Sequence, residues 1–130
     1  MAKSVAGRYL TIPGLVAGDS LAAKQYHVVK MASTDGEVII ASSTTDVMIG
    51  LVQNDPAADE PAEVACAGVA IGKSGDTITI GEMVNSNSTG ELRGTAGAIS
   101  GTERILGIAL EAASDGDLFS VLISPQTFLA

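Results

Sequence analysis

The fold is decided by residues 105–123, ILGIALEAASDGDLFSVLI, in which two short apolar runs flank a polar turn. A run of four to eight apolar residues bounded by turn residues is typical of a buried strand. Asp115-Gly116 is a type I′ hairpin signal, because both central residues of that turn need positive φ. The stretch therefore predicts two strands, at 105–110 and 118–123, joined by a hairpin turn.

The rest of the chain continues this rhythm of short β-branched runs separated by glycine, of which there are 15. Asp76-Thr77-Ile78-Thr79-Ile80 has the clearest strand pattern, since Thr and Ile alternate with a period of two. Residues 59–65 are the helical candidate, and Pro61 limits them to one turn. The fold class is mostly β. Further strands are predicted at 28–31, 37–41, 47–52 and 63–67.

The composition limits the size and chemistry of the core. A chain of 130 residues forms one domain, and 46% of its residues are hydrophobic. The aromatic residues are Tyr9, Tyr26, Phe119 and Phe128, so the core is built from Val, Ile, Leu and Ala. Each missing aromatic forgoes roughly 150–250 Å² of buried area. Association with a partner, or with copies of the chain itself, is therefore an expected source of further burial.

Charge and cysteine content exclude several classes of protein. A net charge of −8 repels phosphate backbones and anionic membranes, which disfavours nucleic-acid binding. Cys66 is the single cysteine, so no intrachain disulfide forms. No apolar run reaches the roughly 18 residues of a membrane span. Gly7, Arg8 and Pro13 interrupt the apolar stretch of a signal peptide, and synthesis in a cytoplasm without export is expected.

The first 30 residues are basic although the chain as a whole is acidic. Their net charge is +3, from four bases and one acid: Lys3, Arg8, Lys24, Lys30 and Asp19. Since the whole chain has a net charge of −8, the remaining residues carry −11. Such asymmetry is typical of a basic terminal segment that meets an acidic surface. The other interpretation is four solvated cations.

The chain also resembles itself. Gly18-Asp19-Ser20-Leu21 is similar to Gly75-Asp76-Thr77-Ile78, residues 48–52 are similar to 106–110, and 33–38 parallel 88–92 with a small shift. The interval from Gly18 to Gly50 equals that from Gly75 to Gly107. Gly50 and Gly107 are predicted to lie where another strand passes closely. The fold expected is a small β-barrel or β-sandwich built from two pseudo-repeated halves, about 17–68 and 74–124, within a single β domain spanning 14–130.

Residues 1–13 precede the repeated unit and are predicted to form an extended N-terminal arm. Tyr9, Leu10 and Ile12 are apolar anchors that pair with a neighbouring subunit or a larger surface. The alternative is a frayed terminus plus one edge strand. On the first interpretation, removing residues 1–13 leaves the domain folded.

Two patterns typical of enzymes and carrier domains have weaker support. Residues 67–74, AGVAIGKS, fit a loose phosphate-loop pattern, but the helix such a loop needs is missing, and a β-turn with a solvated Lys73 is predicted. The segment 67–84 is similar to the turns of lipoyl and biotinyl domains. Those domains carry a modified lysine at a hairpin tip between hydrophobic residues, whereas Gly72 and Ser74 flank Lys73, so this likeness is architectural.

Other candidate sites are also interpreted as structural. Cys66 and His27 form a nucleophile pair only if the fold brings them together, and a buried Cys66 and an edge His27 are expected instead. Calcium needs six to eight converging oxygens, and the acidic residues lack that spacing and are predicted to be solvated turns. They are Asp55, Asp59, Glu60 and Glu63 in one loop and Asp115 and Asp117 in another. No catalytic residue, metal or cofactor is predicted.

Four stretches together resemble a known family. They are VAGDSL at 16–21, IGLV at 49–52, SGDTI at 74–78 and LGIALEAASDGDLFSVLI at 106–123. Over about residues 14–124 the chain is similar to the capsid cement, or head decoration, proteins of tailed bacteriophages. The most specific part of the resemblance is 106–123.

The resemblance implies a non-enzymatic virion protein that binds the exterior of an assembled capsid and bridges neighbouring capsid subunits. The implied partners are a major capsid protein of HK97-like fold and further copies of the chain, as a homotrimer. The implied location is the outer capsid surface of a virion, after synthesis in the host bacterial cytoplasm. The implied interface is the arm, with Lys3, Arg8, Tyr9, Leu10, Ile12 and Pro13. The alternatives are another phage module, associated with a tail tube or a fibre, and a lipoyl-like carrier domain.

Overall fold

The described part of the chain consists of strands and turns. The computed structural model describes residues 8–95 and 103–127, and none of these residues is in a helix, let alone one long enough to span a membrane. The mostly β fold class is confirmed. The ten strands are β1 (Arg8–Thr11), β2 (Val16–Ala17), β3 (Val28–Met31), β4 (Glu37–Ile40), β5 (Met48–Val52), β6 (Val64–Lys73), β7 (Met83–Ser86), β8 (Leu92–Gly94), β9 (Arg104–Ala109) and β10 (Leu118–Thr127).

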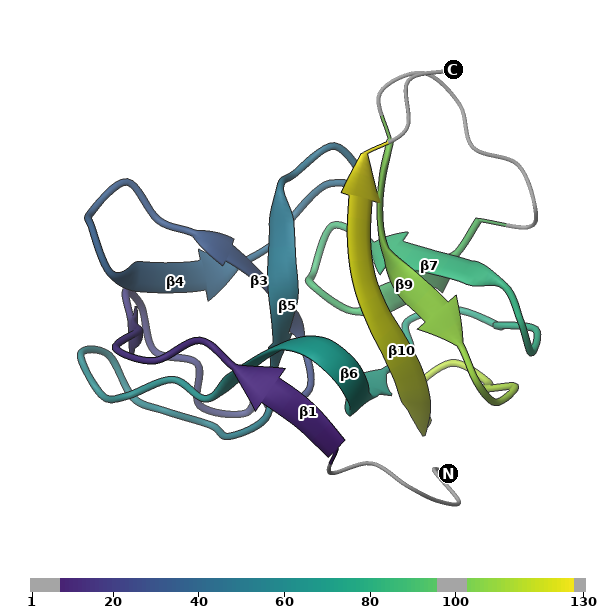
Figure 1. Cartoon of the computed structure of the whole chain (residues 1–130), viewed down its shortest axis with the longest axis horizontal. Helices are drawn as coiled ribbons and strands as arrows, with labels where there is room; N and C mark the ends of the chain where they lie inside the picture. The colour runs from purple at the N-terminus through teal and green to yellow at the C-terminus, as the bar shows by residue number, and fades with distance from the viewer. Residues whose placement is uncertain (1–7, 96–102, 128–130) are drawn as a thin grey trace.

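All ten strands belong to one curved sheet with the order β2-β4-β3-β5-β6-β10-β9-β7-β8, and β1 pairs with β6. Figure 1 shows β5, β6 and β10 in the middle, with β3 and β4 on one side and β7 and β9 on the other. The expected barrel does not form, because the order has two open ends, at β2 and β8. These end strands have two and three residues, and short edge strands limit pairing with other chains.

The strands on the two sides of the central pair follow the same order. On one side β4 pairs with β3, β3 with β5 and β5 with β6; on the other side β8 pairs with β7, β7 with β9 and β9 with β10. The two series join where β6 and β10 pair antiparallel over Leu118–Ile123. This central pairing gives the sheet its longest strands.

Two glycines allow neighbouring strands to approach each other closely. A Cβ at Gly50 would lie 2.0 Å from the carbonyl oxygen of Ala65, and a Cβ at Gly107 would lie 2.0 Å from that of Leu122. No side chain fits at such distances. The prediction that both glycines mark close strand passages is confirmed.

The core is aliphatic and has two parts. The larger cluster lies around the central strands and contains the one described phenylalanine, Phe119, which is fully buried. The smaller cluster lies in the N-terminal half, and Ile12, Ile40 and Ile49 pack against it. It consists of Leu15, Ala17, Leu21, Val29, Val38, Val52, Ala62 and Val64. Val, Ile, Leu and Ala thus supply most of the burial, as the composition predicts.

The segment with the clearest strand pattern is not a strand. Ile78 is buried and exchanges two backbone hydrogen bonds with Ala113, but this is an isolated bridge. The amide of Thr79 donates to the Glu82 carboxylate and its carbonyl accepts the Glu82 amide, which turns the chain at once. Of the two isoleucines in the alternating pattern, Ile78 is buried and Ile80 is 65% exposed, so the pattern gave neither the burial nor the hydrogen-bonding partners that a strand needs.

Two predicted turns also differ from the structure. Gly116 has φ of +89°, while Asp115 is not among the residues with positive φ, so the turn is not type I′. The Asp117 amide bonds the Ser114 carbonyl at 3.0 Å, and β9 and β10 pair antiparallel beyond this longer loop. Residues 67–73, expected to lead into a turn, continue β6 to its full ten residues, because β10 pairs with them.

The first described residues are part of the sheet. Arg8–Thr11 pair with β6, and the Ile12 amide donates to the Val64 carbonyl at 3.2 Å. Residues 8–13 are therefore an edge segment of the domain, which was the alternative interpretation, and residues 1–7 lie outside the described ranges. Removing 1–13 would strip β1 from β6, so that truncation is now expected to destabilise the domain.

Candidate functional site

Five of the six predicted interface residues lie in β1 and the turn that follows it, and Lys3 lies outside the described residues. Leu10 is 69% exposed, the largest exposed fraction among the exposed large hydrophobic residues of the described chain. Arg8 and Pro13 are exposed, whereas Tyr9 and Ile12 are half-buried. We call Arg8, Leu10, Ile12 and Pro13 the β1 surface. It presents aliphatic side chains and one guanidinium to the solvent.

A single glycine fixes the position of β1. Gly68 has φ of +95° and lies opposite Tyr9 on one side and Ile123 of β10 on the other. A Cβ at Gly68 would lie 2.4 Å from the carbonyl oxygen of Arg8. Positive φ is costly for residues with a Cβ, so glycine allows both the backbone conformation and the close approach of β1.

Tyr9 is a structural clamp and not a free anchor. Its ring packs against the larger core cluster and its hydroxyl donates a short hydrogen bond to the Glu63 carboxylate. That hydrogen bond, followed by burial, raises the pKa of Tyr9 to about 12. The phenol thus stays protonated and ties β1 to the start of β6 at physiological pH. Of the predicted interface residues that the structure describes, Tyr9 is the one whose side-chain polar group already forms a hydrogen bond within the domain.

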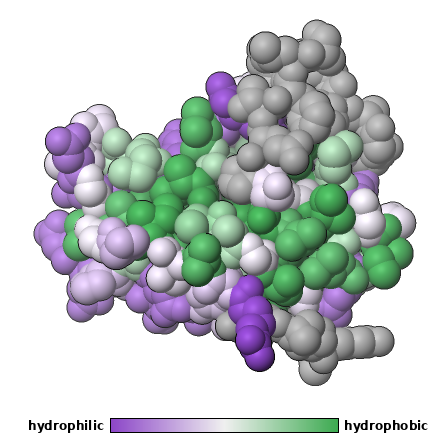
Figure 2. Space-filling model, viewed as in Figure 1, coloured by the Kyte–Doolittle hydropathy of each residue, from purple (hydrophilic) through white to green (hydrophobic). Residues whose placement is uncertain are grey.

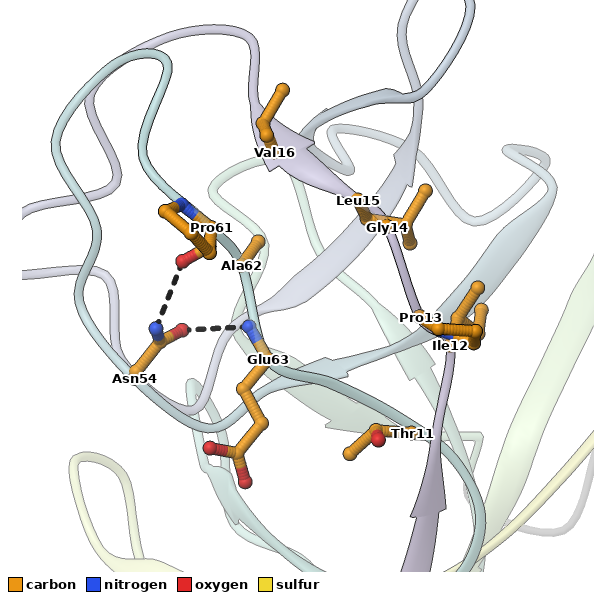
Figure 3. Close-up of a pocket in the computed structure, with 10 residues that line it drawn as sticks. All are labelled: Thr11, Ile12, Pro13, Gly14, Leu15, Val16, Asn54, Pro61, Ala62 and Glu63. Atoms are coloured by element: carbon orange, nitrogen blue, oxygen red, sulfur yellow. Dashed lines mark hydrogen bonds between the residues drawn. The ribbon is translucent and has the colours of Figure 1, made fainter.

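Ile12 and Pro13 line an open groove of about 540 Å³ (Figure 3). One wall is residues 11–16 and the other is Pro61, Ala62 and Glu63, with Asn54 beside them. Pro13, Leu15, Val16 and Ala62 make much of this lining apolar. The groove is joined to the β1 surface through Ile12 and Pro13, and it is large enough to receive one or two side chains of a partner.

The second wall of the groove is held in place by Asn54. Its amide nitrogen donates to the Pro61 carbonyl at 3.0 Å and its amide oxygen accepts the Glu63 amide at 2.9 Å, as Figure 3 shows. A side chain that satisfies two backbone groups of the same segment mimics a strand partner. The groove is therefore pre-formed, which reduces the ordering cost of binding.

The nucleophilic and basic residues are not gathered in one place. The Cys66 thiol contacts the Leu10 carbonyl at 3.5 Å, and its partner there is backbone. His27 is buried, with Nδ1 3.2 Å from the Gln25 carbonyl. Lys73 ends β6 and lies 3.5 Å from the Glu91 carboxylate, so it is neither a solvated turn residue nor the tip of a hairpin. This strand position does not suit a carrier lysine.

Two of the acidic loop residues act as turn caps. Glu60 accepts the Ala57 amide at 2.9 Å and Asp117 accepts the Ser114 amide at 3.0 Å. In the described ranges no three His, Cys, Asp or Glu side chains form a grouping that could hold a metal ion. These hydrogen bonds stabilise the loops on which the acids lie.

His27 is the one histidine of the chain, and burial lowers its pKa below the ordinary 6.5, against the opposing effect of the Gln25 carbonyl. The charged groups that act on it are Glu91, which favours its protonation, and Lys24 and Lys73, which oppose it. His27 therefore stays neutral in the folded protein at neutral pH, and it was expected at an edge rather than in the interior.

We expect the stability of the protein to fall as the pH drops below 6.5. A histidine whose pKa is lower in the folded than in the unfolded state gives full stability above 6.5, and stability is lost as the unfolded state takes up the proton first. Urea unfolding between pH 7.5 and pH 5 would measure this, and NMR titration of the single imidazole would give its pKa directly. His27→Gln should remove the pH dependence in that range. An imidazole pKa above 6.5 would contradict the prediction.

Sequence reasoning missed the far wall of the groove. Asn54 lies in no recognised motif, and Pro61 indicated only the limit of a helical turn. The two walls are brought together by two long-range contacts, the Val16–Pro61 bridge and the hydrogen bond from the Ala62 amide to the Leu15 carbonyl. The prolines at 13, 56 and 61 were the available signal, since proline-rich segments without strand pattern favour surface loops.

The fold and the site together define a class of protein: an open β-sheet domain with an exposed apolar edge and a groove beside it. The family model for phage cement proteins matches residues 15–124 of the sequence, so the chain belongs to this family. It is thus a phage capsid-associated structural protein. No curated protein matches the chain.

The fold has a counterpart among solved structures. The head fiber gp8.5 N base of bacteriophage phi29 is similar with a TM-score of 0.58 and 15% sequence identity, over 89% of this chain and 95% of that chain. At that identity the likeness is one of fold. It extends over nearly the whole of both chains.

Proposed function

We propose that this protein binds the exterior of an assembled phage capsid and stabilises it by bridging neighbouring capsid subunits. The observation that carries the proposal is the match of the phage cement family to residues 15–124. The partner is a major capsid protein of HK97-like fold. The protein is made in the bacterial cytoplasm and ends on the outer surface of the virion.

The β1 surface and the groove are the proposed contact with the capsid. Leu10 and Pro13 offer exposed aliphatic area, and Arg8 offers a cation that forms no ion pair with any described residue. The partner surface that fits is an apolar side chain for the groove and a carboxylate for Arg8. Charge complementarity of this kind fixes orientation and accelerates encounter.

Bridging stabilises a shell by mass action. A protein that binds the assembled lattice and not the separated subunits shifts the equilibrium toward the lattice. As a homotrimer the protein would hold three contacts at once, and linked contacts raise the overall affinity without any new interaction. No chemistry is required of the protein in this role.

The two halves of the domain are proposed to be copies of one unit. The Tyr26 amide bonds the Val52 carbonyl at 2.7 Å, and the Gly81 amide bonds the Ala109 carbonyl at 2.8 Å. The hydrogen bond from the Leu21 amide to the Pro56 carbonyl in the first half likewise corresponds to the one from the Ile78 amide to the Ala113 carbonyl in the second half. Gly50 and Gly107 supply the same close passage in both halves. A protein with two like halves offers related surfaces to two neighbouring capsid subunits.

Capture by purified expanded heads tests the proposal. Heads and labelled protein are mixed, the heads are pelleted and the bound protein is counted. Arg8→Glu combined with Leu10→Ser should lower capture at least about tenfold. The reason is that losing about 1.4 kcal/mol of charge and apolar contacts gives that factor. Ile80→Ser is the matched control, since Ile80 is 65% exposed but lies in the Thr79–Glu82 turn.

The outcomes separate the general role from the residues assigned to it. Absence of any capture of the wild-type protein contradicts capsid binding. Capture of the wild-type protein with equal capture of both variants retains the role and removes the β1 surface from it. A variant of the full chain that lacks only residues 1–7 tests whether Lys3 contributes, while leaving β1 in place.

A fibre-associated module is the second candidate, because the fold of this chain is also that of a head fiber base. The two roles differ in position on the particle. Gold-labelled protein seen by electron microscopy over the whole head favours cement. Label confined to fibre attachment points or to the tail favours the second candidate.

A further inference from the structure

One face of the sheet is unusually apolar for a protein of this charge. Figure 2 shows hydrophobic residues collected in a band over the central strands. Ile108, Leu110, Leu118 and Leu122 are each 37–39% exposed, and all four lie in β10, in β9 or directly after β9. We call these four residues the aliphatic face.

The strand register shows that these residues are neighbours. Ile108 lies opposite Leu122, Leu122 lies opposite Val69 of β6, and Val69 lies opposite Arg8 of β1. Residues paired across antiparallel strands have their side chains on the same side of the sheet. Leu118 follows on β10 with the same side outward, and the Leu110 amide bonds the Ser120 carbonyl at 3.0 Å. The four side chains therefore form one patch.

The charges around this patch differ from those of the rest of the molecule. The chain has 15 acids, yet β1, β6, β9 and β10 contain Arg8, Lys73 and Arg104 and no Asp or Glu. Arg8 lies at the lateral edge formed by β1. On the side of the patch away from β1, directly after β9, the Glu111 carboxylate accepts the Ser120 amide at 2.8 Å. The patch thus has a cation at one side and an anion at the other.

From this arrangement we propose that the aliphatic face is the self-association surface and that its occupant is a second copy of the chain. The apolar side chains of two copies can pack against each other across this face, because the strands that carry them contain no Asp or Glu that would have to be buried. Copies that each carry a charge of −8 repel one another through most of their surface, so the acid-free strands are where they can approach.

The order of events in cement binding also favours a second copy over the shell. This step rests on the proposed function: a protein that adds to an assembled head must first exist free in solution. A contiguous exposed apolar patch is an aggregation liability in a free protein. A stable interface needs about 800 Å² on each partner, so these side chains supply the centre of the interface and the surrounding polar residues supply its rim. Self-association of the protein before it binds the head would cover the apolar patch and so remove the aggregation liability.

Sedimentation velocity over a wide concentration range tests the proposal. The wild-type full chain should form a discrete oligomer. Ile108→Thr combined with Leu122→Thr should raise its dissociation constant at least about tenfold, because central apolar contacts dominate interface energies. Threonine is β-branched and has a high strand propensity, and thermal unfolding of the variant verifies that it folds. Val47→Thr is the matched control, since Val47 is 59% exposed and precedes β5.

Two results would overturn the inference: a wild-type chain that is monomeric at every concentration, or an oligomer that the double variant leaves unchanged. A folded Leu10→Ser chain keeps its oligomer if the two surfaces are distinct. The head-capture result is independent of this measurement, because a monomer can still bind heads. Failure of the aliphatic face and failure of the cement role are therefore told apart.

Discussion

Gly107→Ala should destabilise the protein by at least about 3 kcal/mol, the upper range for a group forced into a packed interior. The new Cβ would lie 2.0 Å from the Leu122 carbonyl oxygen and 3.1 Å from the Ile123 Cα, and both belong to the backbone of β10. Backbone in the middle of a sheet cannot move aside as a flexible side chain does. β9 would have to separate from β10 at the centre of the fold.

The cost is large relative to the total stability of a domain, which is typically about 5–15 kcal/mol. The β9–β10 pairing also carries Leu106, Phe119 and Val121 of the larger core cluster, so separating the strands exposes apolar surface. Chemical denaturation with urea measures the free energy of unfolding. Gly50→Ala should have an effect of similar size, because its Cβ meets the Ala65 carbonyl oxygen at the same 2.0 Å.

Gly18→Ala is the matched control for both substitutions. Gly18 has no positive φ, and the nearest atoms to its Cβ are the ends of the Glu37 and Ile39 side chains at 3.1 and 3.2 Å. Those side chains can shift, so the free energy of unfolding should change by less than about 1 kcal/mol. If Gly107→Ala were no more costly than Gly18→Ala, the close strand passage would be wrong.

Local pattern was sufficient to predict most strands of the central sheet. The runs at 28–31, 37–41, 47–52, 105–110 and 118–123 correspond to β3, β4, β5, β9 and β10 within a residue or two at most boundaries, and β10 extends to Thr127. These segments are rich in Val, Ile and Leu, and they are bounded by turn residues. Gly50 and Gly107 were also predictable, because a glycine inside an aliphatic strand signals close approach.

The remaining strands depend on distant partners. β7, Met83-Val84-Asn85-Ser86, has two polar residues at buried positions, and Asn85 is tolerated because its amide donates to the Arg104 carbonyl at 3.0 Å. Asp76–Ile80 has the reverse character, with a strand pattern but only one bridging partner. Sequence alternation is local information, whereas a strand exists only where a second strand supplies its hydrogen bonds.

The candidate site was half predictable for the same reason. Leu10, Ile12 and Pro13 were recognisable as apolar residues without a partner in the sequence. The hydrogen bond of Tyr9 depends on Glu63, and the position of β1 depends on Gly68. Both residues lie more than 50 positions after Tyr9 in the chain. The groove wall likewise arises from long-range contacts, for which the prolines at 13, 56 and 61 were the available local signal. The sequence could show an apolar segment, but it could not show that the domain itself holds most of this segment in place.

Gly68→Ala should release β1 from β6 while leaving most of the sheet intact. The Cβ would lie 2.4 Å from the Arg8 carbonyl oxygen and 2.9 Å from the Tyr9 Cα, and φ of +95° adds backbone strain. Because β1 is a four-residue edge strand, moving it outward relieves the clash at the cost of its own pairing. The Tyr9–Glu63 hydrogen bond would be lost with it.

Trypsin measures the release, since the Arg8–Tyr9 bond is protected while Arg8–Thr11 pair with β6. Cleavage there should be at least about tenfold faster in Gly68→Ala, the factor that 1.4 kcal/mol of local destabilisation gives when opening precedes cleavage. Gly81→Ala is the control, because Gly81 has φ of +83° but nothing within 4 Å of its Cβ. It carries the same strain without the clash, so its Arg8–Tyr9 bond should stay protected. Equal cleavage in both variants would mean that Gly68 does not hold β1 in position. If Gly68→Ala releases β1 and head capture is unchanged, the protein binds the capsid through another surface.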